Sequence, residues 1–340
     1  MADLVMLTGI SGFVGGHVAL ALLNAGYRVR GSVRDQAKAG KVRATLKNAG
    51  ADVSRLEFVE LDLLSDAGWD AALAGARYLQ HTASPFVIRQ PKDRNELIRP
   101  AVEGTRRALE AGLRAKVERV VLTSSMAAIM YGHDKKRTTP FGPDDWTNPA
   151  APDVSAYTES KVQAEKEAWA IMEAAGRRND LVTINPGSIL GPLLDEDPGT
   201  SVGLLARMFD GSLPATARFY QVVVDIRDVA EAHLRAMTDP AARGKRFPMG
   251  SGTLSLMEMA EALRPALPER SSKLPKFEAP DWIVRIFAIF DVDARGNIGE
   301  LGVYKSADSS EVERLLGHPL IPAEEATVAA ARSLLEHGVA

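Results

Sequence analysis

The chain has 340 residues, a length that suggests about two domains, or one large α/β domain with an extension. Hydrophobic residues make up 46% and charged residues 25%, as in ordinary globular proteins, and the net charge of −3 gives no basic field for non-specific nucleic-acid binding. There is no cysteine, and the six histidines form no HxxH, HxxxH or HExxH pair. Disulfides, thiolate chemistry, iron–sulfur clusters and a helix-borne metal site are therefore not expected.

Short β-rich segments alternate with longer helical patterns through the first half of the chain. The predicted strands are residues 4–8, 28–33, 56–60, 78–81, 119–123 and 181–185. The predicted helices between several of them are residues 12–25, 37–49, 96–113 and 156–174. Alternating strands and helices form βαβ units, and the apolar strands suit a sheet covered on both faces. We therefore predict an α/β fold with a Rossmann-type, doubly wound parallel sheet.

The pattern changes after Pro186, where prolines divide the chain into loops and short helices. A β-rich stretch at 219–225 and a helix near 226–237 look like a return to the first sheet, and the chain from about Gly244 is mostly helical. The predicted units are a nucleotide-binding domain of residues 1–186 plus about 219–240, and a smaller, mainly helical C-terminal substrate subdomain of about 187–218 plus 241–340.

Two apolar stretches raise the question of a membrane segment. Residues 4–23 follow no Lys or Arg and contain several glycines and His17, so they indicate a buried strand, a glycine turn and a helix. Apolar residues that recur at helical spacing, which predicts a core-facing stripe, are Trp282, Ile283, Ile286, Phe287 and Phe290. We expect a soluble, cytoplasmic protein without membrane contact, either a monomer or a homodimer.

A glycine-rich turn follows the first predicted strand, with the sequence Gly9-Ile10-Ser11-Gly12-Phe13-Val14-Gly15. Glycines at this spacing allow a tight turn, close approach of the backbone to a pyrophosphate, and close packing of helix on strand. The next helix would direct its free N–H groups at the phosphates, and an ordinary loop is the alternative. The GxxGxxG spacing resembles that of the extended short-chain dehydrogenase/reductase family, in which this turn binds NAD or NADP.

The end of the second predicted strand bears on which dinucleotide binds. An NAD site would carry an acidic residue here for the adenosine ribose, but the position falls near Val33, which accepts no hydrogen bond. Arg34 follows, and its guanidinium matches a 2′-phosphate in charge and geometry, with Lys41 one to two helical turns further on. The residues therefore favour NADP(H). A solvated Arg34, with a ribose contact from Asp35, is the alternative.

Tyr157 and Lys161 are four positions apart and share one face of a predicted helix. Ser124 and Ser125 directly follow the strand 119–123, at the edge of a parallel sheet where ligands bind. Reduction of a carbonyl needs a hydride and a proton for the developing alkoxide. A phenol can give that proton, a nearby ammonium favours the phenolate, and a serine hydroxyl can orient the substrate oxygen. The pattern predicts a carbonyl-reducing site in which Lys161 also binds the nicotinamide ribose.

These motifs occur together in one branch of the extended family. The further segments that carry the resemblance are Val33-Arg34-Asp35, His81-Thr82-Ala83-Ser84-Pro85, Thr123-Ser124-Ser125, Pro186-Gly187-Ser188 and Val224-Asp225-Ile226-Arg227-Asp228-Val229-Ala230. Over almost its whole length the chain resembles the dihydroflavonol 4-reductase/aldehyde (carbonyl) reductase branch. The resemblance implies that Ser125 is the catalytic serine of the pair, beside Tyr157 and Lys161. It implies further cofactor contacts from Asp62, Leu63, Thr82, Ala83, Ser84, Thr123, Ser124, Pro186, Gly187, Ser188 and Ile189.

Two positions keep alternatives open within this resemblance. Asp62 would face the adenine amino group, but a helix cap explains it nearly as well. Many relatives carry an asparagine before a Val-x-Gly-Thr motif, whereas this chain has Ala101 there. A proton relay through asparagine is therefore in doubt, and water or the ribose hydroxyl would have to carry the proton.

A nucleotide-sugar epimerase or dehydratase would share the fold, the glycine turn and the Tyr/Lys pair. Such dehydratases place acidic residues just after the serine or threonine, but Met126-Ala127-Ala128 follows Ser125 here. Epimerases usually retain NAD tightly, and Arg34 argues against NAD. A non-catalytic NADP-sensing protein, the other alternative, would have no need of the Ser/Tyr/Lys set.

The sequence also offers candidate residues for the substrate site. Side chains expected to line its site are Phe86, Met126, Met208, Phe219 and Tyr220. Such a lining suits an apolar or aromatic aldehyde or ketone better than a diphosphate-bearing sugar. The alternative is that these side chains fill the core between the domains and touch no substrate.

Overall fold

A seven-stranded parallel sheet forms the centre of the protein in a computed structural model that describes residues 2–84, 93–152, 154–209, 211, 213–290 and 298–339. Its order is β10-β6-β5-β4-β1-β2-β3. The strands are β1 (Leu4–Thr8), β2 (Arg28–Val33), β3 (Leu56–Glu60), β4 (Tyr78–His81), β5 (Arg119–Thr123), β6 (Leu181–Pro186) and β10 (Arg246–Met249). The predicted doubly wound α/β fold is confirmed.

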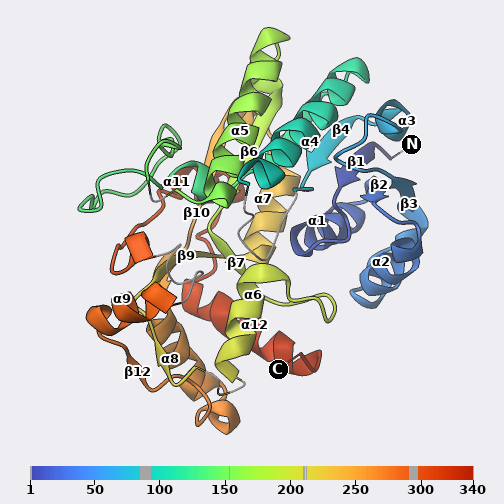
Figure 1. The fold of residues 1–340 in the computed structure, drawn as a ribbon. Coiled ribbons are helices and arrows are strands. Elements are labelled where there is room, and N and C mark those ends of the chain that lie inside the picture. Colours follow the sequence, from blue (N-terminus) through green and yellow to red (C-terminus); the bar gives the residue numbers. More distant parts are fainter. Residues whose placement is uncertain are drawn as a thin grey trace.

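Helices cover both faces of this sheet (Figure 1). On one face lie α1 (Phe13–Asn24), α2 (Ala37–Asn48), α7 (Ile226–Thr238) and α11 (Ser310–Leu316). On the other lie α3 (Trp69–Leu73), α4 (Asn95–Arg114) and α5 (Ala156–Ala174). Strand β1 shows why its first four side chains are apolar. Val5 and Leu7 enter the first core and Leu4 and Met6 the second, because successive side chains of a strand point to opposite faces.

A smaller part, with its own apolar core, is built on two short sheets. One contains β7 (Ser188–Leu190), β9 (Tyr220–Asp225) and β11 (Gly252–Ser255), and the other β8 (Ala215–Thr216) and β12 (Phe277–Glu278). The helices of this part are α6 (Gly199–Phe209), α8 (Leu256–Ala266), α9 (Asp281–Phe290) and α12 (Ala323–Glu336). Short 3-10 helices are η1 (Val53–Arg55), η2 (Met126–Ala128), η3 (Arg178–Asp180), η4 (Pro240–Ala242), η5 (Pro268–Arg270) and η6 (Ile298–Glu300).

The expected return of strand 219–225 to the first sheet is wrong. Strand β9 pairs with β7 and β11 instead, and the strand that joins the main sheet is β10, beside β6. The reason is that β6 passes through Gly187 directly into β7, which carries the chain out of the main sheet to meet β9. A Cβ atom at Gly187 would lie 2.2 Å from the Val222 carbonyl oxygen, so this crossing requires glycine. The domain boundaries themselves stay a prediction.

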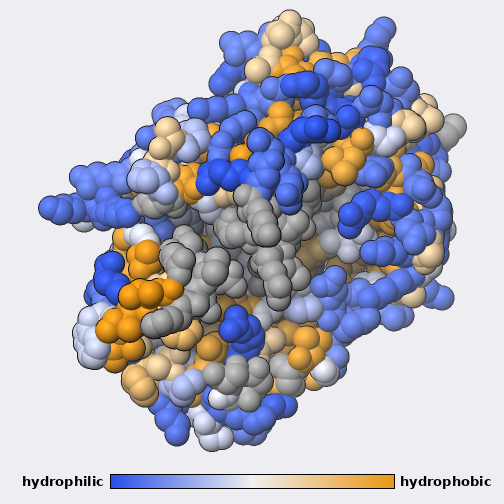
Figure 2. Space-filling view, in the orientation of Figure 1, coloured by the Kyte–Doolittle hydropathy of each residue, from blue (hydrophilic) through white to orange (hydrophobic). Residues whose placement is uncertain are grey.

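The apolar stripe of α9 does not face a core. Among the residues of this helix whose burial the structure describes, which exclude Phe290, only Val284 and Ala288 are buried. The large side chains stay in solvent: Trp282 is 63% exposed, Ile283 42%, Ile286 52% and Phe287 58%. Figure 2 shows hydrophobic side chains gathered over this helix. Among the described residues, no helix combines the length and apolar character needed to cross a bilayer.

Candidate active site

The predicted site residues lie at one edge of the main sheet. The glycine turn follows β1, residues 82–84 follow β4, Ser124 and Ser125 follow β5, and Pro186 ends β6. These four strands are neighbours in the order β6-β5-β4-β1. Because they are parallel, their carboxyl ends meet at this edge, where ligands of such sheets bind.

Close packing shapes the glycine turn. A Cβ at Gly15 would lie 2.1 Å from the Gly9 carbonyl oxygen, and a Cβ at Gly9, whose φ is +74°, would lie 2.8 Å from Ala83 Cα. At Gly12 a Cβ would make only an ordinary contact at 3.5 Å, so packing within the protein does not require this glycine. Gly12 caps α1 without a side-chain hydrogen bond from any described residue. The turn therefore offers open backbone and free N–H groups, which fits a pyrophosphate.

Hydrogen bonds around Thr8 hold the segment after β4 against this turn. Thr82 Oγ1 donates to the Thr8 carbonyl at 2.7 Å, and the Ala83 N–H donates to Thr8 Oγ1 at 3.2 Å. His81 Nδ1 lies 2.8 Å from the same hydroxyl. Burial, and after it the charge of Lys161, lowers the pKa of His81 to about 3. The histidine is therefore a neutral structural partner here.

Helix α5 positions Tyr157 and Lys161. Its N-cap is Ser155, whose hydroxyl accepts the Thr158 N–H at 3.1 Å. Lys161 Nζ lies 5.8 Å from the centre of the Tyr157 ring and donates a hydrogen bond to Ser84 Oγ at 3.1 Å. The structure thus brings together Tyr157, Lys161 and Ser84, which the sequence places 77 positions from Lys161.

Ser125 lies at the carboxyl end of β5, where it caps η2. Its hydroxyl accepts the Ala127 N–H at 3.1 Å and lies 3.5 Å from the Pro186 carbonyl. Pro186 begins the segment that the resemblance assigns to the nicotinamide. The predicted catalytic serine therefore faces that segment, with a hydroxyl proton that only a long hydrogen bond engages.

A buried carboxylate that sequence reasoning missed supports this turn. Glu165 is 1% exposed and continues the i, i+4, i+8 series of Tyr157 and Lys161 along α5. The donors to its two oxygens are Ser124 Oγ (2.5 Å), Arg246 Nε (2.6 Å), Asn185 Nδ2 (2.7 Å), Thr183 Oγ1 (3.2 Å) and Trp169 Nε1 (3.2 Å). The Ser124 hydroxyl, predicted to contact the cofactor, is thereby turned into this network.

Arg246 extends the network to the segment before α5. Its Nη1 donates to the carbonyls of Pro143 and Asp145 at 2.5 and 2.7 Å, and its guanidinium lies 3.7 Å from the centre of the Trp146 ring. Its Nη2 is buried and has no hydrogen-bond partner among the described residues. Since Asn185 also donates to the Ser125 carbonyl at 3.3 Å, one connected set of polar groups fixes the serine turn.

Comparison with known proteins shows to which family the chain belongs. A model described as the NAD dependent epimerase/dehydratase family matches residues 5–250, more than two thirds of the chain. The chain belongs to this family.

Named relatives narrow the family to reductases. The ketoreductase azaE of Aspergillus niger is 34% identical over 300 residues, which cover 83% of this chain and 87% of that protein. Cinnamoyl-CoA reductase CAD2 of Medicago truncatula is 34% identical over 250 residues, 72% of this chain and 75% of that protein. The structure of Gre2 from Candida albicans in complex with NADPH has a TM-score of 0.79 at 26% identity and covers 98% of this chain and 99% of that one. The predicted resemblance is confirmed, and this epimerase/dehydratase-family chain is an oxidoreductase.

The end of β2 carries the residues predicted to select the family's cofactor. Arg34 is exposed and has no ion pair among the described residues. The Asp35 carboxylate accepts the Ala37 N–H at 2.8 Å at the start of α2, and the Asp62 carboxylate accepts the Leu64 N–H at 2.9 Å. Both acids therefore cap turns, and Asp62 caps no helix, because the next helix, α3, begins at Trp69. Arg34 presents an unpaired charge at this end of the site.

Lys41 is held by acidic residues that sequence reasoning did not connect to it. Its Nζ donates to Glu196 at 2.7 Å and lies 3.4 Å from Asp195. The same segment contacts α1, because His17 Nε2 lies 3.0 Å from the Pro192 carbonyl. Lys41 is thus near Arg34 in sequence but is engaged by carboxylates that a cofactor phosphate would have to displace.

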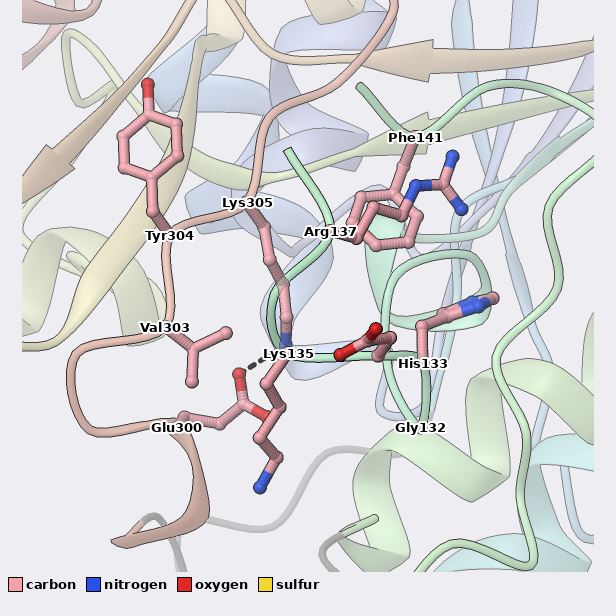
Figure 3. A pocket seen from close by; sticks show the side chains of 10 residues that line it. Gly132, His133, Lys135, Arg137, Phe141, Glu300, Val303, Tyr304 and Lys305 are labelled. Atoms are coloured by element: carbon pink, nitrogen blue, oxygen red, sulfur yellow. Dashed lines mark hydrogen bonds and ion pairs between the residues drawn. The ribbon is translucent and has the colours of Figure 1, made fainter. Parts of the chain in front are cut away.

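Tyr131, which lies near Tyr157, and the Lys305–Glu300 pair beside Tyr131 were not predicted from the sequence. Burial raises the pKa of the Tyr131 phenol, and the nearby Glu300 and Tyr157 raise it further. Lys305 Nζ lies 4.0 Å from the centre of the Tyr131 ring and forms an ion pair with Glu300. Figure 3 shows this pair on the C-terminal segment, facing the loop that carries Arg137. The contacts join segments far apart in the sequence, so no local pattern could reveal them.

The residues predicted to line the substrate site have different surroundings. Met126 and Met208 have no exposed surface. Met126 lies in a small apolar cluster with Ile129 and Met130, and Met208 lies in the core of the smaller part, not in a core between the domains. Phe219 and Tyr220 are half-buried, and the Tyr220 ring meets Tyr304 edge to face at 5.4 Å. Phe86 lies outside the described residues. Within the described part of the chain, no group of three or more His, Asp or Glu is arranged to hold a metal ion.

Proposed function

We propose that the protein is an NADPH-dependent reductase that transfers hydride to the carbonyl of an apolar or aromatic aldehyde or ketone. The observation that carries this proposal is the arrangement of Tyr157 and Lys161 with Ser84, on the sheet edge that also presents Ser125 and the glycine turn. A phenol, an ammonium and a serine hydroxyl at a dinucleotide site are the groups that carbonyl reduction needs.

The residues present fit NADPH, which supplies the hydride when it is bound. The glycine turn would hold the pyrophosphate on the N-terminus of α1, and the free guanidinium of Arg34 would bind the 2′-phosphate. Lys161 would hold the nicotinamide ribose, and Ala83 and residues 186–189 would line the nicotinamide. The Gre2 structure in complex with NADPH supports this choice of cofactor.

Tyr157 is the proton donor in this proposal. Its hydroxyl gives a proton to the carbonyl oxygen as that oxygen gains negative charge, and the Lys161 ammonium favours the phenolate that remains. The Ser125 hydroxyl donates a hydrogen bond to the same oxygen and so fixes its position. Tyr157 must then regain a proton from solvent.

Ser84 is the residue we propose for that return path. The relay asparagine of many relatives is replaced by Ala101, which is 3% exposed and carries no polar group. Ser84 Oγ already accepts from Lys161 Nζ, and a hydroxyl can accept one proton while it donates another. The Lys161–Ser84 pair therefore supplies a polar route where the asparagine is missing.

The surroundings of Tyr157 support an apolar substrate. Tyr131 is close enough to Tyr157 to be influenced by its charge, and it packs against a cluster that contains Met126, Ile129 and Met130. A sugar dehydratase would carry an acidic residue just after Ser125. Here that segment, Met126–Ala128, is buried and contains no acidic residue. The names of the relatives, a ketoreductase and a cinnamoyl-CoA reductase, support carbonyl reduction.

The test is NADPH consumption with a panel of aryl aldehydes, aryl ketones, aliphatic ketones, steroids and nucleotide sugars. We expect turnover of aryl or apolar carbonyl compounds, and its loss in Tyr157→Phe. Turnover of nucleotide sugars alone would replace the proposal by the epimerase or dehydratase alternative. Stoichiometric NADPH binding without turnover of any compound would favour the sensing protein.

A further inference from the structure

A charged cavity lies at the edge of the main sheet opposite the glycine turn. Its volume is about 420 Å³, and it adjoins the amino ends of β4 and β5 and the turns that precede β6 and β10. Basic side chains outnumber acidic ones around it. The lining residues that carry charge are Arg77, Lys116, Arg119, Arg177 and Arg243, with Glu118 and Asp180. Because the strands are parallel, this edge is remote from the glycine turn and the catalytic residues.

Arg119 is the buried member of this cluster. It is 6% exposed, and its Nη1 donates to the carbonyls of Ala236 and Asp239 at the end of α7, at 2.9 and 3.3 Å. Its Nε is buried without a hydrogen-bond partner among the described residues. Burial lowers the pKa of this guanidinium, and the nearby charge of Arg243 lowers it further, while the carboxylates of Asp180 and Asp239 act in the opposite direction without reversing the shift. A buried cation beside a second cation is unfavourable unless an anion offsets the charge.

The other arginines share too few carboxylates. The Asp180 carboxylate accepts hydrogen bonds from both Arg177 and Arg243, at 2.8 and 2.5 Å. Arg77 forms ion pairs with both Glu118 and Asp3. Lys116 has no ion pair among the described residues and is exposed at the cavity. The cavity therefore keeps an excess of positive charge after every carboxylate in it is paired.

Lys116 stands where this chain otherwise places glycine. It is the only non-glycine residue of the described chain with a left-handed backbone, at φ +57°, directly after the C-cap of α4. The turn is closed by the Lys116 N–H on Leu113 and the Val117 N–H on Gly112. The same pair of hydrogen bonds closes the ends of four other described helices. In those helices the residue equivalent to Lys116 is a glycine: Gly26, Gly50, Gly176 and Gly338.

A lysine in this conformation is strained, whereas glycine is not. The turn would form with glycine, as it does four times elsewhere, so turn formation does not explain the lysine. Strained residues are found where a side chain has a function. The strain at Lys116 and the unpaired Nε of Arg119 are independent observations, and both concern the same cavity.

We propose that this cavity is a binding site for a compact anion with at least two negative charges, of the phosphate-ester or pyrophosphate type. Guanidinium and ammonium groups recognise such groups by charge-assisted hydrogen bonds. The ligand binds independently of the dinucleotide, because the two sites lie at opposite edges of the sheet. Arg119, at the start of the strand that ends beside Ser124, is the cation on which the anion is centred.

The experiment is calorimetric titration of inorganic pyrophosphate into the protein saturated with NADPH, so that the cofactor phosphate sites are filled. We expect one saturable site whose affinity falls as salt is added. Lys116→Gly should weaken pyrophosphate about tenfold, the effect of losing one hydrogen bond to a charged group. It should not lower the melting temperature, because glycine relieves the strained backbone. The matched control is Lys276→Gly, the same change at an exposed lysine outside the cavity, which should leave the affinity unchanged.

Three results would overturn the proposal. The first is no saturable pyrophosphate binding to the NADPH-saturated protein, and the second is equal affinity in the wild type and Lys116→Gly. The third is tighter binding of citrate than of pyrophosphate, which would assign the cavity to carboxylate ligands instead of phosphate ligands.

Discussion

Replacing Glu165 by glutamine removes a negative charge shared by five buried donors while it keeps the size of the side chain. An amide has one acceptor oxygen, so if that oxygen stays on Arg246 the new NH₂ group faces Ser124 Oγ and Asn185 Nδ2. The Asn185 donor then meets another donor. Arg246 is left buried, at 8% exposure, without its carboxylate.

The size of this effect follows from the burial of the pair. Removing one partner of a buried ion pair destabilises a protein by about 3–5 kcal/mol. Arg246 keeps two carbonyl acceptors and the Trp146 ring, so we predict the lower end, about 3 kcal/mol. In a protein of this size that corresponds to a melting temperature lower by about 5 °C. Because the network holds the serine turn, kcat should also fall about tenfold or more.

The measurements are thermal unfolding and steady-state kinetics of Glu165→Gln beside Glu167→Gln. The control makes the same change two residues later on α5, where Glu167 forms a partly exposed pair with Arg106 that contributes at most about 1 kcal/mol. The NADPH dissociation constant should change by less than about twofold in both variants. If Glu165→Gln matches the control in melting temperature and kcat, the buried network does not position Ser125.

Further predictions concern the proton, the cofactor and pH. Tyr157→Phe should lower kcat by about 10²-fold or more while NADPH still binds, as turnover and fluorescence titration would show, and near-normal turnover would contradict the assignment. Arg34→Glu should weaken NADPH binding several-fold with little effect on NADH, and equal affinity of the wild type for both cofactors would refute the preference. Glu196→Gln should release Lys41 and strengthen binding of NADPH but not of NADH; an unchanged NADPH affinity would exclude Lys41 from the phosphate site. Burial lowers the pKa of three histidines: His17 to about 4, and His81 and His233 to about 3. The unfolded chain binds protons at these groups below about pH 6.5 and the folded chain does not, so the melting temperature should fall steadily from pH 7 toward pH 4.5, and a flat profile would show that they are protonated in the fold.

Strong local patterns explain why the main sheet and the shared helix face of Tyr157 and Lys161 could be predicted. Apolar strands and a glycine turn are encoded in a few adjacent positions, and Tyr157 and Lys161 need only the helical period to share a face. Partners in a second sheet are not encoded in this way. Residues 219–225 have the composition of a strand whether they pair with β6 or with β7 and β11, so only the tertiary structure decides.

Other parts of the site depend on contacts between distant segments. Glu165 could have been noticed as the third residue of its helical series, but nothing local shows that Arg246, 81 positions away, would bury it. Likewise, nothing in the local sequence shows that Lys305 would lie over the Tyr131 ring. On α9, helical periodicity gave the right element and the wrong environment, because an apolar stripe does not reveal whether anything packs on it.

Hydride tracing tests the central claim most directly. NADPH deuterated at the transferable position of the nicotinamide is incubated with the protein and an aryl ketone that it turns over, and the alcohol product is analysed by mass spectrometry. The proposal predicts one deuterium on the carbinol carbon of the alcohol, with one NADPH consumed per product. A product without deuterium, or a nucleotide sugar converted with no net consumption of NADPH, would contradict it.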